Sequence, residues 1–337
     1  MKKYLSLVVA ALFLGLLVTG CGGSQGEQQK IADQKGQPIV LKLGHIQTQE
    51  DLWQLGAERF AQLVAQKTGG QVKIEIYPNS TLGGDRDMAE GMQMGSVDFA
   101  LIAGVLGNFE KSFQILELPY LFEDEEHLRK VIYGPIGEEL LERLRTNANI
   151  RGLAFWERGS RQVTSNKPIN SIEDIKGLKI RVPEIPAMVE AWKAMGANPT
   201  PMAWSEVYSA LEQNVIEAQE NPIPYIYAGN IHEVQKYLAI TNHKYEYVVL
   251  CMSELTYNKL TPEQRQAIEE AAAEATEYEN QLVKEKTEEY LEVMKAKGMQ
   301  VTYPDIQPFK EKAQSVHRSY AEHLGLVDLY ERIVNAK

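Results

Sequence analysis

The chain is poor in cysteine, with only two in 337 residues. Two cysteines cannot build a disulfide framework or a zinc site made of four cysteine ligands. Basic residues are also in deficit, since 35 Lys and Arg stand against 46 Asp and Glu and the formal net charge is −11. A surface of this sign repels phosphate backbones, so we expect no nucleic-acid partner.

Motifs for metals, nucleotide cofactors and catalysis are missing as well. No two of the six histidines have the i, i+4 spacing of zinc proteases, and no G-x-x-x-x-G-K-[ST] phosphate loop occurs. A G-x-S-x-G match at 22–26 lies in a polar linker rather than between a strand and a helix, so we interpret it as chance. Cys251 lies in an apolar run, which is typical of a buried small side chain. We expect no catalytic residues, no metal and no cofactor.

A long apolar run occurs only at the N-terminus, which reads MKKYLSLVVAALFLGLLVTGC. The run over 5–17 is shorter than the roughly 20 apolar residues of a membrane span, and its layout is that of a secretory signal. The small residues before Cys21 resemble the lipobox of bacterial lipoproteins. We expect a signal peptide over 1–20, a lipidated Cys21 and a flexible linker over 21–37. The alternative is an ordinary cleaved signal with an incidental cysteine.

Hydrophobic periodicity predicts an α/β fold. In the first part of the chain we expect strands at 38–44, 72–77 and 97–102, with helices at 51–67 and 85–95. Strands that alternate with helices at this spacing indicate βαβ units.

A second α/β unit follows. We expect strands at 150–156, 178–182, 237–241 and 245–252, a short helix from a capping box at Ser171 to Gly177, and helices at 184–195 and 206–214, the last capped by Ser205.

Residues 262–296 contain no Gly or Pro after Pro262 and predict one helix about 50 Å long. Because its apolar residues do not sustain a heptad repeat, we favour a packed helix over a coiled-coil arm.

Two arginines lie in otherwise apolar surroundings. Arg181 lies in the strand K-I-R-V-P, and Arg161 lies at an expected strand start after a glycine turn. The pattern alone indicates two solvent-facing side chains. The functional hypothesis is a pair of guanidinium groups that face a ligand carboxylate, since the planar fork of arginine donates two parallel hydrogen bonds.

At 161–221 the chain resembles the substrate-binding proteins of TRAP transporters, the tripartite ATP-independent periplasmic systems. This stretch includes R-Q-V-T-S-N, K-I-R-V-P, P-T-P-M-A-W-S-E and Q-E-N-P. Further matches are Y-P-N-S from Tyr77, L-P-Y from Leu118 and E-V-Q-K-Y from Glu233. The likeness runs from about Ile39 to near the C-terminus.

The resemblance implies a two-domain periplasmic-binding-protein-like fold with a cleft that closes on its ligand. The chain would cross between the domains more than once, and a long helix would span both. One domain would hold 38–158 and 247–286, and the other 159–246 and 287–337. The implied partners are a small carboxylate ligand and TRAP permease subunits driven by an ion gradient. With the N-terminal lipid, we expect an extracytoplasmic, membrane-anchored monomer.

The resemblance also assigns candidate ligand-binding residues. Arg181 aligns with an arginine that forms a salt bridge with the ligand carboxylate, and Asn221 with an asparagine that hydrogen-bonds the same group. Arg161 aligns with a second ligand arginine, Trp204 with an aromatic of the cleft, and Asp85 with an acid near the polar end of the ligand. The alternatives are that Trp204 only packs in the core and that Asp85 only caps a helix.

The ligand class is a sugar acid such as a uronate in our interpretation, with a C4-dicarboxylate as the alternative. Members that bind sialic acid carry Asn and Glu where this chain has Ile46 and Ala103, which argues against sialic acid. Gln47, Gln49 and Asp85 are candidates for hydroxyl groups, or surface residues. A sensor lipoprotein for an organic acid and a lipid-anchored enzyme are the other function classes.

Overall fold

One mixed β-sheet runs through the protein, which we describe from a computed structural model of residues 37–336. The expected signal peptide, Cys21 and nearly all of the linker lie outside the described residues. Within these residues the sheet has nine strands, in the order β2-β1-β3-β8-β4-β7-β5-β6, and β9 pairs with β8. The strands are β1 (Ile39–Gly44), β2 (Val72–Tyr77), β3 (Phe99–Ile102), β4 (Ile150–Ser165), β5 (Lys179–Val182), β6 (Asn198–Pro201), β7 (Ala218–Pro222), β8 (Tyr237–Ser253) and β9 (Gln300–Thr302).

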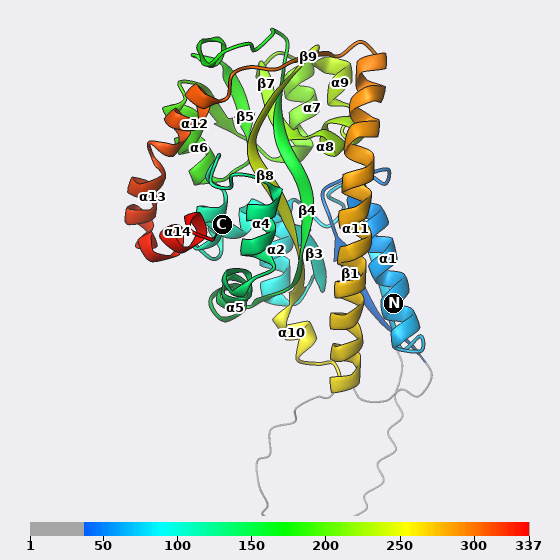
Figure 1. Cartoon of the computed structure of the whole chain (residues 1–337). Helices are drawn as coiled ribbons and strands as arrows, with labels where there is room; N and C mark the ends of the chain where they lie inside the picture. The colour runs from blue at the N-terminus through cyan, green and yellow to red at the C-terminus, as the bar shows by residue number, and fades with distance from the viewer. Residues whose placement is uncertain (1–36, 337) are drawn as a thin grey trace, which may run out of the picture. The chain divides into compact units, whose positions relative to one another are not determined.

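Helices cover this sheet and connect its strands (Figure 1). The described helices are α1 (Leu52–Lys67), α2 (Asp85–Met94), η1 (Gly104–Asn108), α3 (Phe113–Leu116), α4 (Glu125–Ile132), α5 (Pro135–Ala148), η2 (Ile172–Ile175), α6 (Pro186–Ala194), α7 (Trp204–Glu212), α8 (Ile223–Ala228), α9 (Ile231–Val234), α10 (Glu254–Tyr257), α11 (Pro262–Ala296), α12 (Gln307–Gln314), α13 (His317–Leu324) and α14 (Val327–Val334). The expected α/β class is confirmed.

The two long central strands, β4 and β8, are antiparallel and join two sets of shorter parallel strands. On one side β8 pairs antiparallel with β3, and β3 continues through β1 to β2 with these three strands parallel to one another. On the other side β4 pairs antiparallel with β7, and β7 continues through β5 to β6 with these three strands parallel to one another. The chain therefore passes between the two halves of the sheet along β4 and again along β8. The domain boundaries given above stay a prediction.

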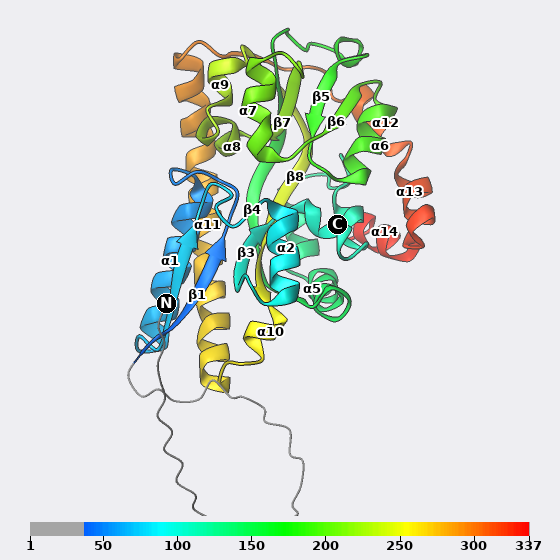
Figure 2. The ribbon, with the colours of Figure 1, turned by 180° about the vertical axis from the view of Figure 1, so that it is seen from behind.

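The long helix forms where the sequence places it, as α11 from Pro262 to Ala296. It begins with a capping box, in which Thr261 accepts from the backbone of Gln264 and the Gln264 side chain accepts from the backbone of Thr261. Its small residues Ala271 and Ala275 are buried in one cluster with the side chains of α1. The two helices lie side by side in Figure 1 and Figure 2, so the packed helix is confirmed and the coiled-coil arm is wrong.

The two central strands are longer than the sequence pattern predicts. The expected strand 150–156 continues to Ser165, and the expected strands 237–241 and 245–252 are one strand, β8. Three register shifts interrupt β4, so the alternation of apolar and polar residues breaks while the backbone pairing continues. Arg161 therefore lies inside β4 rather than at a strand start.

The predicted cap of the helix at 206–214 is also wrong. The helix, α7, begins at Trp204 with Ala203 as its N-cap, so Ser205 is a residue of the first turn. By contrast, the capping box at Ser171 is confirmed, and it opens the short helix η2.

Glu279 of α11 is fully buried, and neither of its carboxylate oxygens has a hydrogen-bond partner. The side chain fits because α1 has a glycine opposite it: a Cβ on Gly56 would lie 3.0 Å from Glu279 Cγ and 2.8 Å from the Trp156 ring. Burial, together with the nearby Asp51 carboxyl, raises the pKa of Glu279 well above its usual value. Folding therefore favours the protonated form of this acid.

We predict that Glu279→Gln is at least as stable as the wild type at pH 8. A raised pKa in the folded state stabilises the protein at low pH, and this contribution is lost as the pH rises from the unfolded pKa toward the folded one. The neutral amide has no such loss, so the melting temperature of the variant should gain on that of the wild type between pH 5 and pH 8.

Circular-dichroism melts at both pH values provide the measurement. Glu277→Gln, an exposed position two residues earlier on the same helix, is the control and should show no such trend. An equal loss of stability at both pH values in Glu279→Gln would mean that the carboxyl group makes a specific stabilising contact.

Candidate functional site

The five candidate ligand residues line one cavity. Asp85, Arg161, Arg181, Trp204 and Asn221 all form part of the wall of an inner chamber of about 50 Å³. An outer cavity of about 220 Å³ shares Asp85, Arg181 and Trp204 with this chamber. The structure thus brings all five side chains together, and their roles toward a ligand stay a prediction.

Neighbouring strands bring the charged and amide groups to this place. Arg161 on β4 and Asn221 on β7 lie one register position apart, since Arg161 pairs with Pro222. Arg181 on β5 pairs with Gln219 of β7, two residues before Asn221. Trp204 and Asp85 are the first residues of α7 and α2. Side chains at least 17 residues apart in the sequence therefore meet because three adjacent strands and two helix starts meet.

Arg161 is buried and firmly held. Its Nε and Nη2 donate to the Glu220 carboxylate, and its Nη1 donates to Glu246 Oε2 at 2.6 Å. Its Nη2 also donates to the Glu220 carbonyl at 2.7 Å. The solvent-facing position that the pattern indicates is wrong, because two buried carboxylates compensate this charge in the interior.

These carboxylates belong to a larger buried ion network. His243 Nε2 lies 2.9 Å from Glu220 Oε2, and Lys244 donates to Glu246 at 2.6 Å. Burial opposes ionisation of Glu246, but Lys244 and Arg161 lower its pKa to about 2. Burial likewise opposes ionisation of Glu220, yet Arg161 and His243 lower its pKa. Both acids are therefore anions at neutral pH.

Arg181 is buried as well, but only some of its N–H groups form hydrogen bonds. Its Nε and Nη2 both donate to the Met202 carbonyl, at 2.9 and 2.6 Å. No hydrogen bond in the described structure uses its Nη1. Its guanidinium carbon lies 5.7 Å from the centre of the Trp204 ring. Burial lowers the pKa of Arg181 to about 10, so it remains a cation at neutral pH.

Asn221 and Asp85 also keep hydrogen-bonding capacity. Asn221 Nδ2 donates to Gln219 Oε1 at 2.9 Å, which leaves its second amide hydrogen unused. Asp85 Oδ1 is buried and has no partner. The alternative that Asp85 only caps α2 is wrong, because Gly84 is the N-cap and its backbone N–H donates to Asp87. Burial, opposed by Arg158 and Arg181, raises the pKa of Asp85 to about 7.

Sequence reasoning missed a third arginine, Arg158, which also lines the inner chamber. Arg158 and Arg161 are three residues apart, and a regular strand would place them on opposite faces. In β4, however, Glu157 pairs with Tyr247 and Gly159 with Glu246, so Arg158 is an extra residue in a bulge. A glycine inside a strand pattern often marks a bulge, so Gly159 was the sequence signal that could have indicated Arg158. In the structure Gly159 has a φ of 77°.

The remaining wall of the chamber is partly apolar. Ile46 and Ala103 line it, together with Gln47, which is buried. Gln49 is exposed and does not line the chamber. Of the two glutamines considered for ligand hydroxyls, only Gln47 is placed near the candidate residues.

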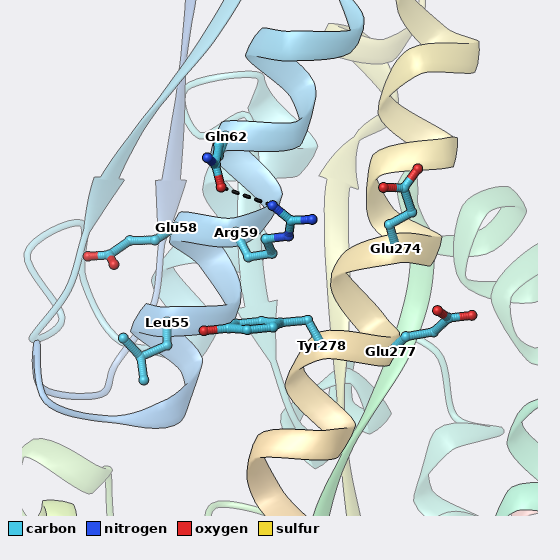
Figure 3. A pocket seen from close by; sticks show the side chains of 7 residues that line it. All are labelled: Leu55, Glu58, Arg59, Gln62, Glu274, Glu277 and Tyr278. Atoms are coloured by element: carbon cyan, nitrogen blue, oxygen red, sulfur yellow. Dashed lines mark hydrogen bonds between the residues drawn. The ribbon is translucent and has the colours of Figure 1, made fainter.

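A larger hollow lies elsewhere, between α1 and α11 (Figure 3). It has a volume of about 860 Å³, and Arg59 Nη1 donates to Gln62 at 3.0 Å. Figure 3 shows Arg59 between the two helices with Glu274 across from it, while Glu58 and Glu277 point away. The lining of this hollow contains three exposed acids, Glu58, Glu274 and Glu277, and one arginine, which does not favour a carboxylate ligand. This hollow contains none of the five candidate residues.

Two further features concern function. Among residues 37–336, no three His, Cys, Asp or Glu side chains are gathered in a way that could hold a metal ion. Every helix in the same part of the chain is too short or too polar to cross a membrane. Cys251 is buried in the core, and burial raises the pKa of its thiol far above the usual value.

Residues 43–323 match the DctP family, described as bacterial extracellular solute-binding protein, family 7. The chain belongs to this family of TRAP solute-binding proteins. Its members are substrate-binding components of transporters, and homologues bind small acids and act with TRAP membrane permeases.

Relatives with known ligands cover most of the chain. A solute-binding protein of Roseobacter denitrificans is 38% identical over 82% of this chain and 86% of its own. Its crystal structure contains L-galactonate and matches 88% of this chain and 99% of that chain with a TM-score of 0.85 at 36% identity.

Two more relatives bind different sugar acids. A structure from Sulfitobacter sp. NAS-14.1, with β-D-galacturonate bound, has a TM-score of 0.85 at 28% identity and covers 88% of this chain and 99% of that chain. The sialic acid-binding protein SiaP of Vibrio cholerae is 35% identical over 85% of this chain and 89% of its own. The TRAP family that the motifs indicate is therefore confirmed.

We predict that Glu220→Gln destabilises the protein by about 3–5 kcal/mol, because Arg161 loses one of its two buried carboxylate partners. Denaturant unfolding at pH 7 measures this loss. Glu212→Gln, an exposed position on α7, is the control and should stay within about 0.5 kcal/mol of the wild type. A Glu220→Gln protein with wild-type stability would contradict the described network.

Proposed function

We propose that this chain captures a sugar acid, a uronate or an aldonate, outside the cytoplasm and delivers it to a TRAP permease driven by an ion gradient. The observation that carries the proposal is the meeting of Arg181, Asn221 and Arg161 in one buried chamber beside Trp204 and Asp85. The relatives crystallised with L-galactonate and β-D-galacturonate support the ligand class.

The carboxylate of the ligand would bind between Arg181 and Asn221. Arg181 Nη1 and the second amide hydrogen of Asn221 are unused donors from neighbouring parts of the sheet. Hydrogen bonds from a cation to a carboxylate are stronger than neutral ones, and they strengthen further when closure removes water. Arg161, whose charge Glu220 and Glu246 compensate, would add at most one further donor.

Closure would proceed between a domain of 38–158 with 247–286 and a domain of 159–246 with 287–337. We base this proposal on β4 and β8, which run from one half of the sheet to the other, and on α11, which packs against α1 and also against α8. Because only a few elements connect the two halves, a hinge movement can occur in which each half stays rigid.

The setting outside the membrane belongs to the same proposal. A signal peptide over 1–20 would be removed, and a lipid on Cys21 would anchor a monomer that has no enzymatic activity of its own. The polar composition of 21–37 supports a linker long enough to separate the folded part from the lipid surface.

The choice among acids rests on the chamber wall. Ile46 and Ala103 place apolar groups where sialic-acid-binding members carry Asn and Glu. For a carboxylate the chamber offers the unused Nη1 of Arg181, and beside it lies the unpaired Asp85 Oδ1, which suits a hydroxyl donor better than a second carboxylate. These features favour a uronate or an aldonate over both sialic acid and a C4-dicarboxylate.

A thermal-shift screen tests the ligand class directly. The protein starting after Cys21 is melted with D-galacturonate, D-glucuronate, L-galactonate, succinate, sialic acid and neutral galactose. A ligand at about 100 times its dissociation constant adds about 2.7 kcal/mol, which corresponds to a shift of several degrees. We expect shifts with uronates or aldonates and none with galactose. A response to succinate alone would replace the sugar acid by a dicarboxylate, and silence throughout would contradict the proposal.

We predict that Arg181→Lys weakens binding of the best acid from this screen by at least about 100-fold. A lysine ammonium cannot hold the Met202 carbonyl and a ligand carboxylate with one planar fork. Titration calorimetry at pH 7 measures the affinity, and Arg59→Lys on α1 is the control with unchanged affinity. Wild-type affinity in Arg181→Lys would remove Arg181 from the carboxylate site.

A further inference from the structure

Arg158 is a buried cation whose Nε has no hydrogen-bonding partner. Its side chain is 4% exposed and its Nε is buried without a partner. The polar groups that its guanidinium group meets are the Tyr225 hydroxyl and Glu246 Oε2, the latter 3.9 Å from Nη1. The group lies between two aromatic rings, 3.8 Å from the centre of Tyr225 and 4.7 Å from that of Trp53. Aromatic faces stabilise the charge but accept no conventional hydrogen bonds, so the N–H groups stay available.

The other two arginines of the chamber are engaged differently. Arg161 donates to two carboxylates, and Arg181 donates twice to a carbonyl. The carboxylate nearest to Arg158 is that of Glu246, 3.9 Å from its Nη1, and this acid is already bonded to Arg161 and Lys244. A buried guanidinium that lacks acceptors is costly unless a ligand or water supplies them.

Further unpaired groups lie in the same wall. Trp53 Nε1 is a buried donor without a partner, while Gln47 Oε1 and Asp85 Oδ1 are buried acceptors without partners. All three residues line the inner chamber together with Arg158. A second carboxylate would satisfy only the donors, because an ionised carboxylate accepts and does not donate. Hydroxyl groups both donate and accept, so they match the whole set.

We propose that Arg158 is a specificity-determining residue that donates, together with Trp53 Nε1, to hydroxyl oxygens at the end of the ligand distal to its carboxylate. This inference rests on the proposed sugar-acid function. It places the polyhydroxylated end of the ligand against the part of the inner chamber formed by Arg158, Trp53, Gln47 and Asp85. Arg158 then selects long, hydroxylated acids over short acids that carry the same carboxylate.

The chain offers variants that separate this role from folding and from general attraction of anions. Arg158→Gln removes the charge and most of the donors, and Glu246 keeps Arg161 and Lys244 as partners. Arg158→Lys keeps the charge but loses the fork. Trp53→Phe keeps an aromatic ring beside Arg158 and removes only the indole donor.

The experiment compares D-galacturonate with D-glycerate, a short acid that has the carboxylate and only two hydroxyl groups. Calorimetry gives both affinities for the wild type, Arg158→Gln, Arg158→Lys, Trp53→Phe and the control Arg59→Gln, after melts confirm that each protein is folded. We expect Arg158→Gln and Arg158→Lys to weaken D-galacturonate binding by 10- to 100-fold and D-glycerate binding by less than threefold. Trp53→Phe should act in the same direction, more weakly.

The outcomes distinguish the two proposals. Equal losses for both acids in Arg158→Gln, or no loss for either, would overturn the role of Arg158 while the sugar-acid function stands. If Arg158→Gln does not fold, Trp53→Phe and Arg158→Lys decide by the same comparison. A wild type that binds neither acid, nor any other acid of the screen above, would overturn the proposed function and this inference with it.

Discussion

The ion pairs of Arg161 with Glu220 and Glu246 are the constraint on which the centre of this protein depends. They join β4 to both of its neighbours, β7 and β8, in the interior of the sheet. A buried charge is tolerated only with its partners in place, so this network specifies how the three strands align. Arg161 is therefore a fixed part of the chamber wall, with few donors left for a ligand.

The bulge in β4 brings a further arginine, Arg158, into the chamber wall. Because Arg158 is an extra residue opposite β8, it reaches the same side of the sheet as Arg161 despite their odd spacing. The three arginines then differ in the donors that remain unused. Arg161 uses nearly all of its N–H groups, Arg181 keeps its Nη1, and Arg158 keeps its Nε and has only a distant carboxylate, Glu246, 3.9 Å from its Nη1. Their chemistry toward a ligand differs although their side chains are identical.

Local patterns predicted those elements whose buried and exposed residues follow a regular period along the chain. The strand Val72–Tyr77 and the helix Pro262–Ala296 have the predicted bounds, since alternation and capping are local signals. The same patterns did not predict the full length of the central strands. In β4 and β8, charged residues are buried against other charged residues, and hydropathy alone cannot distinguish such a strand from a solvent-exposed turn.

The sequence by itself determined the family and the long helix, because ordered motifs and local periodicity are written along the chain, and it named Asp85, Arg161, Arg181, Trp204 and Asn221 as candidates. Only the tertiary structure decided that these five line one chamber, that Arg158 joins them, and which donors remain free. The physical reason is distance along the chain: Arg161 is 59 residues from Glu220 and 85 from Glu246. A hydrogen bond between such residues exists only once the sheet has brought them together.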